Sequence, residues 1–353
     1  MDYGNFQELP DLAVRSLGGS VVYANDESFA ERENLITPGP ARHDRALFGP
    51  KGKVYDGWET RRRREPGCDE AIVRLGAPGI VRGVVLDTAW FTGNYPPEAS
   101  VEGLCADGHP SVDELLADDG WERLVPRSQV KGDTANDFAV SSRRRCTHVR
   151  LRIYPDGGVA RLRVHGTALP DPRQLDAFGV VDLAALEHGG VVLDCSNRFY
   201  SAPNNLLMPG PTRSMGEGWE TARRRDDGND WVLVRLAGEA QVRIAELDTS
   251  HFLHNSPGWA SLRGRSGPDG GWFELLERTP LRPDTRHRFL LPEGGGGRPP
   301  VSEVRLDIYP DGGMARLRLF GELTPAGRAD LGNRWSAAQP STDLNDTTPE
   351  GQR

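Results

Sequence analysis

Lysine is nearly absent from this chain of 353 residues, whose formal net charge is -8 and whose basic residues are almost all arginine. An acidic balance disfavours nucleic acid and anionic membrane surfaces as partners, because both attract basic proteins. No apolar run reaches the roughly 18 residues that a membrane-spanning helix needs, so we expect no spanning segment. The N-terminal residues also lack a basic and then apolar signal pattern, and we expect no secretory signal.

Cysteine is scarce and scattered. Cys68, Cys105, Cys146 and Cys195 show no CxxC spacing, and they occupy no matching positions in the repeats described below. A duplicated disulfide or zinc site would require such matching, so we expect reduced thiols in a cytoplasmic protein. The chain also lacks a GxSxG elbow, a P-loop, an HExxH motif and a glycine-rich strand-to-helix turn, which disfavours serine hydrolases, nucleotide enzymes and zincins.

The chain contains one module written twice. Ile153–Gly166 reads IYPDGGVARLRVHG and Ile308–Gly321 reads IYPDGGMARLRLFG, while DGWETRRRR at Asp56–Arg64 matches EGWETARRR at Glu217–Arg225. A period this long is a domain, since solenoid repeats span about 20–50 residues. We therefore expect a first repeat at residues 1–168, a linker at 169–186, a second repeat at 187–323 and a polar, disordered tail at 324–353.

The local patterns favour strands. Segments such as AIVRL, HVRLRIY and VARLRVHG are short, rich in branched residues and often alternate with period two. Each YPDGG segment has turn chemistry between two such strands, and VDELLADDG at Val112–Gly120 predicts a turn or two of helix. The fold class that we predict is all-β, with two tandem jelly-roll β-sandwich domains related by internal duplication. We expect the glycine-rich stretch Gly294–Pro300 to be a mobile loop.

The GWET segment is the first candidate site. It places Glu59 beside Arg61–Arg64 in one repeat and Glu220 beside Arg223–Arg225 in the other. Guanidinium groups bind carboxylates in a bidentate manner, so the cluster suits a small anionic substrate, although only half of the arginines in a strand face one side. The glutamate could bind a urea-like N–H or take a proton from water. The alternative is that these charges form ion pairs on a sheet surface or between the domains.

A loop at a strand end is the second candidate. It reads DTAWFTGNYPP from Asp87 and DTSHFLHNSPG from Asp248. His251 and His254 occur only in the second copy and could be an acid–base pair, a metal site with Asp248, or plain polar surface.

The remaining shared residues have a structural interpretation. We expect Tyr154 and Tyr309 to pack in hairpins with Asp156 and Asp311. The core is expected to hold the matched tryptophans of both repeats, which are Trp58, Trp121, Trp219 and Trp272.

These motifs, in this order and in two copies, resemble the allantoicase (allantoate amidinohydrolase) family over roughly Gly18 to Gly321. The resemblance implies a tandem jelly-roll fold related to galactose-binding-like domains. It also implies hydrolysis of allantoate to ureidoglycolate and urea in purine breakdown. Two alternatives stay open: a non-catalytic tandem module that binds a small ligand or carbohydrate, and an amidinohydrolase of related specificity acting on ureidoglycolate.

With this resemblance, each candidate residue takes a role. The catalytic candidates are Glu59, Glu220 and His251. The substrate-binding candidates are Arg61, Arg63, Arg223, Arg225, Asn94, Asn255, Asp87 and Asp248. The cofactor is left open: a divalent metal such as Mn²⁺ is one alternative, but the chain has no clear metal motif. The expected partners are the substrate and further copies of the chain, because closed homo-oligomers are common among metabolic enzymes.

Overall fold

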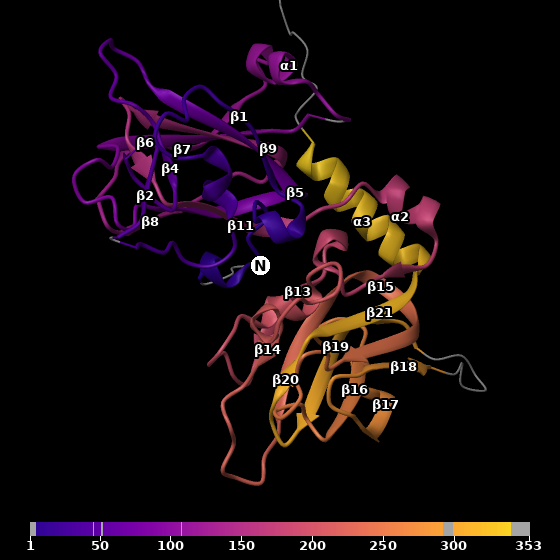
Figure 1. The fold of residues 1–353 in the computed structure, drawn as a ribbon. Coiled ribbons are helices and arrows are strands. Elements are labelled where there is room, and N and C mark those ends of the chain that lie inside the picture. The colour runs from indigo at the N-terminus through magenta and orange to yellow at the C-terminus, as the bar shows by residue number, and fades with distance from the viewer. Residues whose placement is uncertain (1–4, 45, 51, 107, 292–298, 340–353) are drawn as a thin grey trace, which may run out of the picture.

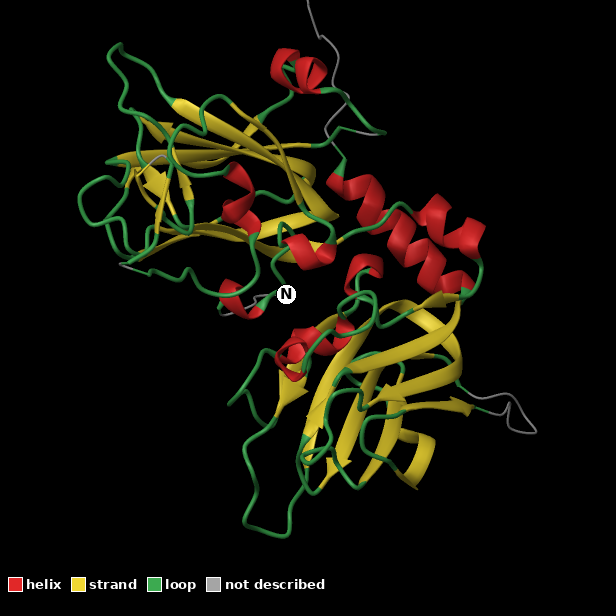
Figure 2. Ribbon diagram, viewed as in Figure 1, coloured by secondary structure: helices red, strands yellow, loops and turns green. Residues whose placement is uncertain are grey.

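Two β-rich repeats lie end to end, with helices α2 (Pro172–Phe178) and α3 (Pro325–Ala338) where they meet (Figures 1 and 2). The computed structural model describes residues 5–44, 46–50, 52–106, 108–291 and 299–339, and therefore almost none of the expected loop at Gly294–Pro300. None of the described helices is long and apolar enough to cross a membrane. All four cysteines are free thiols.

The first repeat is built around one long bent strand. Its strands are β1 (Ser20–Ala24), β2 (Phe48–Gly49), β3 (Gly52–Lys53), β4 (Trp58–Glu59), β5 (Asp69–Asp87), β6 (Glu98–Leu104), β7 (Glu122–Gln129), β8 (Ala135–Ala139), β9 (Arg145–Tyr154), β10 (Gly158–Val159) and β11 (Arg161–Ala168). The first half of β5 pairs with β1 and β9, and its second half pairs with β8 and β11, with the register shifting between Arg74 and Gly79. This strand therefore belongs to both layers of the sandwich.

The second repeat copies this arrangement. Its strands are β12 (Val181–Asp182), β13 (Val191–Cys195), β14 (Trp219–Glu220), β15 (Asp230–Asp248), β16 (Trp259–Arg265), β17 (Phe273–Pro280), β18 (Arg286–Leu290), β19 (Val301–Tyr309), β20 (Gly313–Met314) and β21 (Arg316–Leu323). The long strand β15 pairs with β13 and β19 and then with β18 and β21. The expectation of two duplicated jelly-roll β-sandwiches is confirmed.

Helices are short and few in the described residues. They are α1 (Val112–Ala117), α2 (Pro172–Phe178) and α3 (Pro325–Ala338), with single 3-10 turns at Phe6–Glu8, Arg15–Leu17, Arg32–Ile36, Leu186–His188, Pro203–Leu207 and Met215–Glu217. The expected helix at Val112–Gly120 is confirmed as α1, which begins with a capping box between Ser111 and Glu114.

Buried aliphatic side chains from both layers of each repeat form one continuous core cluster. Trp58 and Trp219 are completely buried in it, as expected. The expectation fails for Trp272, which is 39% exposed and stacks under the Arg265 guanidinium at 4.6 Å. Trp121 is half-buried and stacks with Arg150. These two rings cover arginine side chains of β16 and β9, and planar cations and aromatic faces attract each other.

The expected linker is partly structured and partly belongs to the second repeat. Its second half contains β12, which pairs with β21. Asp182 there accepts hydrogen bonds from the Leu319 amide and the Arg318 guanidinium. At the start of the first repeat, Asp11 accepts the matching hydrogen bonds from the Val164 amide and the Arg163 guanidinium.

The expectation of a disordered tail from residue 324 is wrong for its first half. Residues 325–338 form α3, capped by the Thr324 hydroxyl, which accepts a hydrogen bond from the Gly327 amide. Leu331 and Ala338 are buried, and Trp335 stacks against the buried Arg145 guanidinium of the first repeat at 4.3 Å. This helix lies along the junction between the repeats (Figure 1). Residues 340–353 lie outside the described residues.

Candidate functional site

Three sequence motifs meet at one end of the first repeat. The GWET strand β4 pairs with β10 of the YPDGG segment, with Glu59 opposite Gly158. The Thr60 amide donates to the Gly157 carbonyl at 3.2 Å, and the Gly158 amide donates to the Asn94 carbonyl at 2.7 Å. The GWET strand, the turn and the loop that follows β5 therefore form one hydrogen-bonded unit.

The second repeat builds the same unit. Glu220 lies opposite Gly313 in the β14–β20 pair. The Thr221 amide donates to Gly312 at 3.1 Å, and the Gly313 amide donates to Asn255 at 2.8 Å. Residues that are distant in the sequence are thus brought together twice by the same backbone geometry.

A carboxylate–amide pair lies at the centre of each unit. Asn94 Nδ2 donates to Glu59 Oε1 at 2.6 Å, and Asn255 Nδ2 donates to Glu220 Oε1 at 2.5 Å. Burial raises the pKa of Glu59, because desolvation disfavours the charged carboxylate, while the Asn94 hydrogen bond acts in the opposite direction. A raised pKa favours exchange of a proton with a substrate. The structure therefore joins Glu59 with Asn94, and Glu220 with Asn255, and all four are candidate site residues of the sequence analysis.

Glycine allows the turn to approach this pair closely. Gly157 has a φ of 144°, a conformation that side chains rarely adopt. A Cβ atom placed on it would lie 2.7 Å from the Pro96 nitrogen and 2.8 Å from the Asn94 carbonyl oxygen. Gly312 has a φ of 135° and an equally close contact with the Asn255 carbonyl. The turn therefore holds the asparagine loop in place.

The arginines divide into structural and exposed groups. Arg63 Nη1 donates to the buried Asp69 Oδ1 at 2.7 Å, and its amide donates to Asp156 Oδ2 at 2.8 Å. Arg224 makes the same two contacts, to Asp230 and Asp311. These bonds fix the loop after the GWET strand, so Arg63 forms the kind of ion pair that the sequence analysis gave as the alternative to substrate binding.

The remaining candidate arginines are open to solvent. Arg61 is held against Asp26 at 3.2 Å but is 77% exposed. A groove is lined by Phe29 and by the residues from Arg61 to Glu65. The Phe29 amide donates to the Glu59 carbonyl at 3.2 Å, which links this groove to the strand that carries the glutamate. Arg223 and Arg225 of the second repeat are also exposed.

Asp87 and Asp248 hold their own loops. Asp87 Oδ1 accepts from the Ala89 amide at 2.8 Å, and Asp248 Oδ1 accepts from the Ser250 amide and hydroxyl. Asp248 is only 1% exposed, so a substrate in solution does not reach its carboxylate. The structure thus gives these two residues turn-stabilising contacts, and no hydrogen bond joins either of them to a glutamate of the candidate pairs in the part of the chain that it describes.

His251 is likewise used in loop packing. Its amide donates to Asp284 Oδ1 at 2.7 Å, and its Nε2 lies 2.9 Å from the Thr212 carbonyl oxygen. Trp90 makes the matching contacts in the first repeat, with its amide on Asp133 and its indole N–H on Ala41. No hydrogen bond joins His251 to Glu220 among the residues that the structure describes.

Several contributing residues escaped the sequence analysis. Phe29 and Asp26 precede the GWET motif by about thirty residues, and no periodic pattern connects them to it. Asp69 and Asp230 do occupy matching positions at the starts of β5 and β15, and that match was the available signal. In the described residues no group of three or more histidine, cysteine or acidic side chains could hold a metal ion, so we assign no residue to Mn²⁺.

Fold and site together define a tandem β-sandwich protein with a carboxylate–amide pair in each repeat. The family model described as the allantoicase repeat matches residues 10–169 and 181–324. The chain belongs to the allantoicase family.

Similar proteins support this membership across nearly the whole chain. A protein of Nocardia farcinica named probable allantoicase is 61% identical over 319 residues, covering 90% of this chain and 95% of that protein. Dictyostelium discoideum allantoicase is 41% identical over 321 residues, covering 88% and 86%. The crystal structure of allantoicase from Saccharomyces cerevisiae matches with a TM-score of 0.76 at 33% identity, covering 89% and 93%.

Proposed function

We propose that the protein hydrolyses allantoate to ureidoglycolate and urea. The observation that carries this proposal is family membership, with a relative at 61% identity, combined with a buried glutamate–asparagine pair on the strand that leads into an arginine-lined groove. A small carboxylate that bears two ureido groups needs cationic groups at one end and hydrogen-bonding groups at the other. The groove and the pair supply these in that order.

The substrate carboxylate binds to the exposed arginines of the groove. Arg62 and Arg64 make no ion pair with any residue that the structure describes, so their guanidinium groups are available for bidentate binding. Asn94 uses its Nδ2 on Glu59, which leaves its Oδ1 to accept a ureido N–H.

Glu59 moves the proton. Burial raises its pKa, which favours a carboxyl group that can donate, and the proton passes to the ureido nitrogen as the bond from the central carbon breaks and urea leaves. Water then adds to that carbon, and its proton returns to the Glu59 carboxylate. One water is consumed, and the residue ends the cycle in its starting state.

The test is urea release from allantoate by the purified protein, measured before and after chelator treatment and with added Mn²⁺. Rapid release supports the proposal. If no urea appears under any of these conditions, the alternative of a non-catalytic binding module replaces it. Ureidoglycolate is offered in parallel, and urea release from it alone would indicate the related specificity.

The cellular setting that we propose is the cytoplasm, supported by four free cysteines. We also propose a homo-oligomer that does not bind nucleic acid, which agrees with the net charge of -8. Light scattering coupled to gel filtration tests the oligomeric state.

A further inference from the structure

The two carboxylate–amide pairs have different surroundings at one matched position. The indole N–H of Trp58 donates to the Asp26 carbonyl at 2.8 Å, and that of Trp219 donates to the Asn197 carbonyl at 2.9 Å. Asp26 and Asn197 are therefore equivalent in the fold. The first is an anion and the second is a neutral amide.

The residue that binds this side chain also differs between the repeats. In the first repeat, Asp26 Oδ1 accepts from the Arg61 amide at 3.0 Å and its carboxylate holds the Arg61 guanidinium. In the second repeat, Asn197 Oδ1 accepts from the Ala222 amide at 3.2 Å. The backbone contact is kept, but the anion and the guanidinium are both missing.

The loops also differ in charge. Residues 61–65 contain four arginines and one glutamate, whereas residues 222–227 contain three arginines and two aspartates. Asp226 accepts from Arg224 Nε at 2.9 Å and Nη2 at 3.0 Å, in addition to the bond that Arg224 makes with Asp230. A pocket beside this loop includes Asp226 and Asp227 in its lining. An anionic substrate is therefore attracted less strongly to the second repeat.

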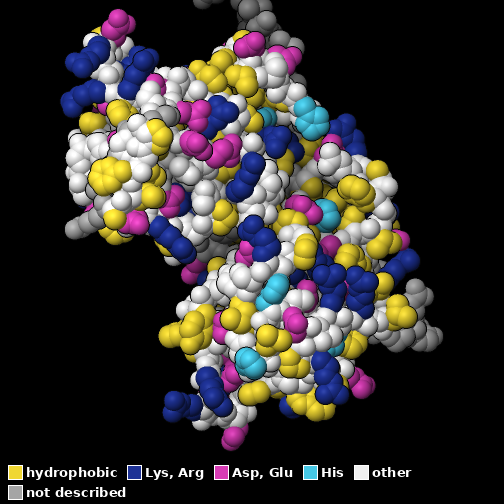
Figure 3. Space-filling model, in the orientation of Figure 1, with side chains coloured by type: hydrophobic (Ala, Val, Ile, Leu, Met, Phe, Trp, Pro, Cys, Tyr) yellow, Lys and Arg dark blue, Asp and Glu magenta, His cyan; other side chains and the backbone are white. Residues whose placement is uncertain are grey.

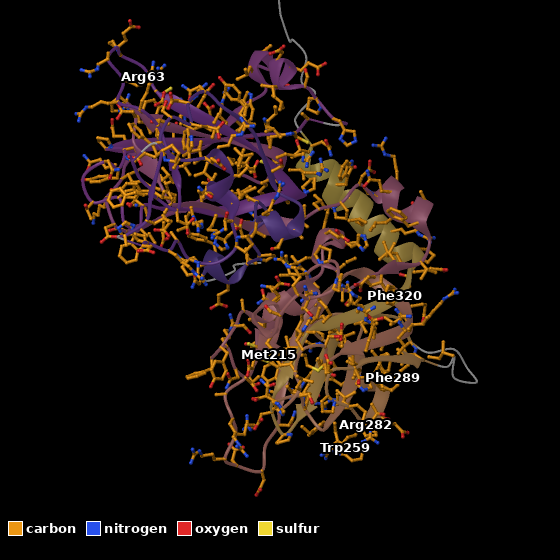
Figure 4. The ribbon with its side chains drawn as sticks, viewed as in Figure 1. Arg63, Met215, Trp259, Arg282, Phe289 and Phe320 are labelled. Carbon is orange, nitrogen blue, oxygen red and sulfur yellow. The ribbon has the colours of Figure 1, made fainter. Side chains whose placement is uncertain are left out.

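The glutamates themselves are buried to different degrees. Glu59 is 9% exposed, while Glu220 is more open to solvent. Exclusion of water strengthens the hydrogen bonds and charges that act on a substrate. Figure 4 places Arg63 at the tip of the first repeat and Trp259, which lines the pocket of the second, at the opposite end of the molecule. The two sites therefore lie at opposite ends of one chain.

We propose that hydrolysis takes place only in the first repeat, at Glu59 and Asn94, with Arg61 oriented by Asp26 as part of the substrate clamp. The second repeat keeps the framework and the glutamate–asparagine pair but does not turn over the substrate. This inference rests on the proposed function. Figure 3 shows a group of basic side chains at the tip of the first repeat, and further basic side chains along the junction and at the tip of the second repeat.

The first experiment compares Glu59→Gln with Glu220→Gln in urea release from allantoate. Both changes keep the shape of the side chain and an oxygen that accepts from the neighbouring asparagine. We expect Glu59→Gln to lower kcat by about 100-fold or more, the effect of removing a general acid–base group. Glu220→Gln should keep kcat within about twofold of the wild type. Loss of half the activity in each variant, or loss of activity only in Glu220→Gln, would overturn the assignment.

The second experiment gives the first repeat the pattern of the second, with Asp26→Asn and Arg61→Ala combined. Loss of a charge-assisted contact should raise KM about tenfold or more with a smaller effect on kcat. Arg123→Ala, an exposed arginine on β7, is the matched control and should leave KM unchanged. An unchanged KM in the double variant contradicts the clamp. A wild-type protein that releases no urea refutes the proposed function itself, whereas an active wild type with an active Glu59→Gln refutes only the placement in the first repeat.

Discussion

Replacing Arg63 by alanine should destabilise the first repeat rather than act through substrate binding alone. The carboxylate of Asp69 is 2% exposed, and its Oδ1 accepts from Arg63 at 2.7 Å and from Asn25 Nδ2 at 2.9 Å. Its Oδ2 is buried and has no partner among the described residues. Removal of the guanidinium therefore leaves a buried charge with one hydrogen bond.

The magnitude follows from this geometry. Breaking a buried ion pair by removing one partner costs about 3–5 kcal/mol. Arg63 is 28% exposed and the Asn25 bond remains, so we expect about 2–4 kcal/mol for Arg63→Ala. For a domain of this size each kcal/mol lowers Tm by about 2–4 °C, which gives a decrease of about 5–15 °C.

Thermal unfolding followed by circular dichroism measures this effect, with Arg62→Ala as the control in the same loop. Arg62 is exposed, so its replacement should change the free energy of unfolding by less than about 0.5 kcal/mol while weakening substrate binding. If Arg63→Ala and Arg62→Ala unfold at the same temperature, the buried ion pair does not stabilise the loop, and the structural position of Arg63 is refuted.

Three further changes test other parts of the structure. Gly157→Ala combines an unfavourable φ with contacts below 3 Å, so it should lower the free energy of unfolding by about 2–5 kcal/mol in a chemical unfolding titration. Gly93 has open space around it, so the control Gly93→Ala should be neutral or slightly stabilising. Because burial raises the pKa of Glu59, wild-type stability is lost as pH rises from the ordinary glutamate range through that raised pKa. The Tm of Glu59→Gln relative to the wild type should therefore increase with pH in a thermal-shift series, and a Tm difference that stays constant contradicts the shift. Trp335→Ala removes the ring that covers the buried Arg145 and should cost about 2–4 kcal/mol in thermal unfolding, while Ser336→Ala on the exposed side of α3 should not.

The strands could be predicted because they follow from local rules. Alternation with period two marked the strands, and the duplicated Trp58 and Trp219 marked core positions that the structure buries completely. The tail was misjudged because its polar end dominated the composition. Leu331, Trp335 and Ala338, spaced by four and three, were the overlooked sign of an apolar helix face.

The division of roles among the arginines could not be predicted from the motif. Alternation along a strand suggested that Arg61 and Arg63 act together, but the strand β4 ends at Glu59 and the chain then forms a loop. In that loop the partners decide the roles: Asp69 binds Arg63 and Asp26 binds Arg61. Both acidic residues come from other parts of the chain, so only the fold could identify them.

Comparison of the repeats separates residues needed for folding from residues free to change. Arg63 and Arg224 keep the same two partners, and Gly157 and Gly312 keep the same unusual backbone conformation. These contacts hold three segments together in each sandwich, so a change in either copy would carry a stability cost. The Asp26–Arg61 pair is surface-exposed on its arginine side, and exposed ion pairs contribute little to stability. Its absence from the second copy therefore costs the fold little, and the presence of the pair in the first copy is better explained by binding of an anionic substrate.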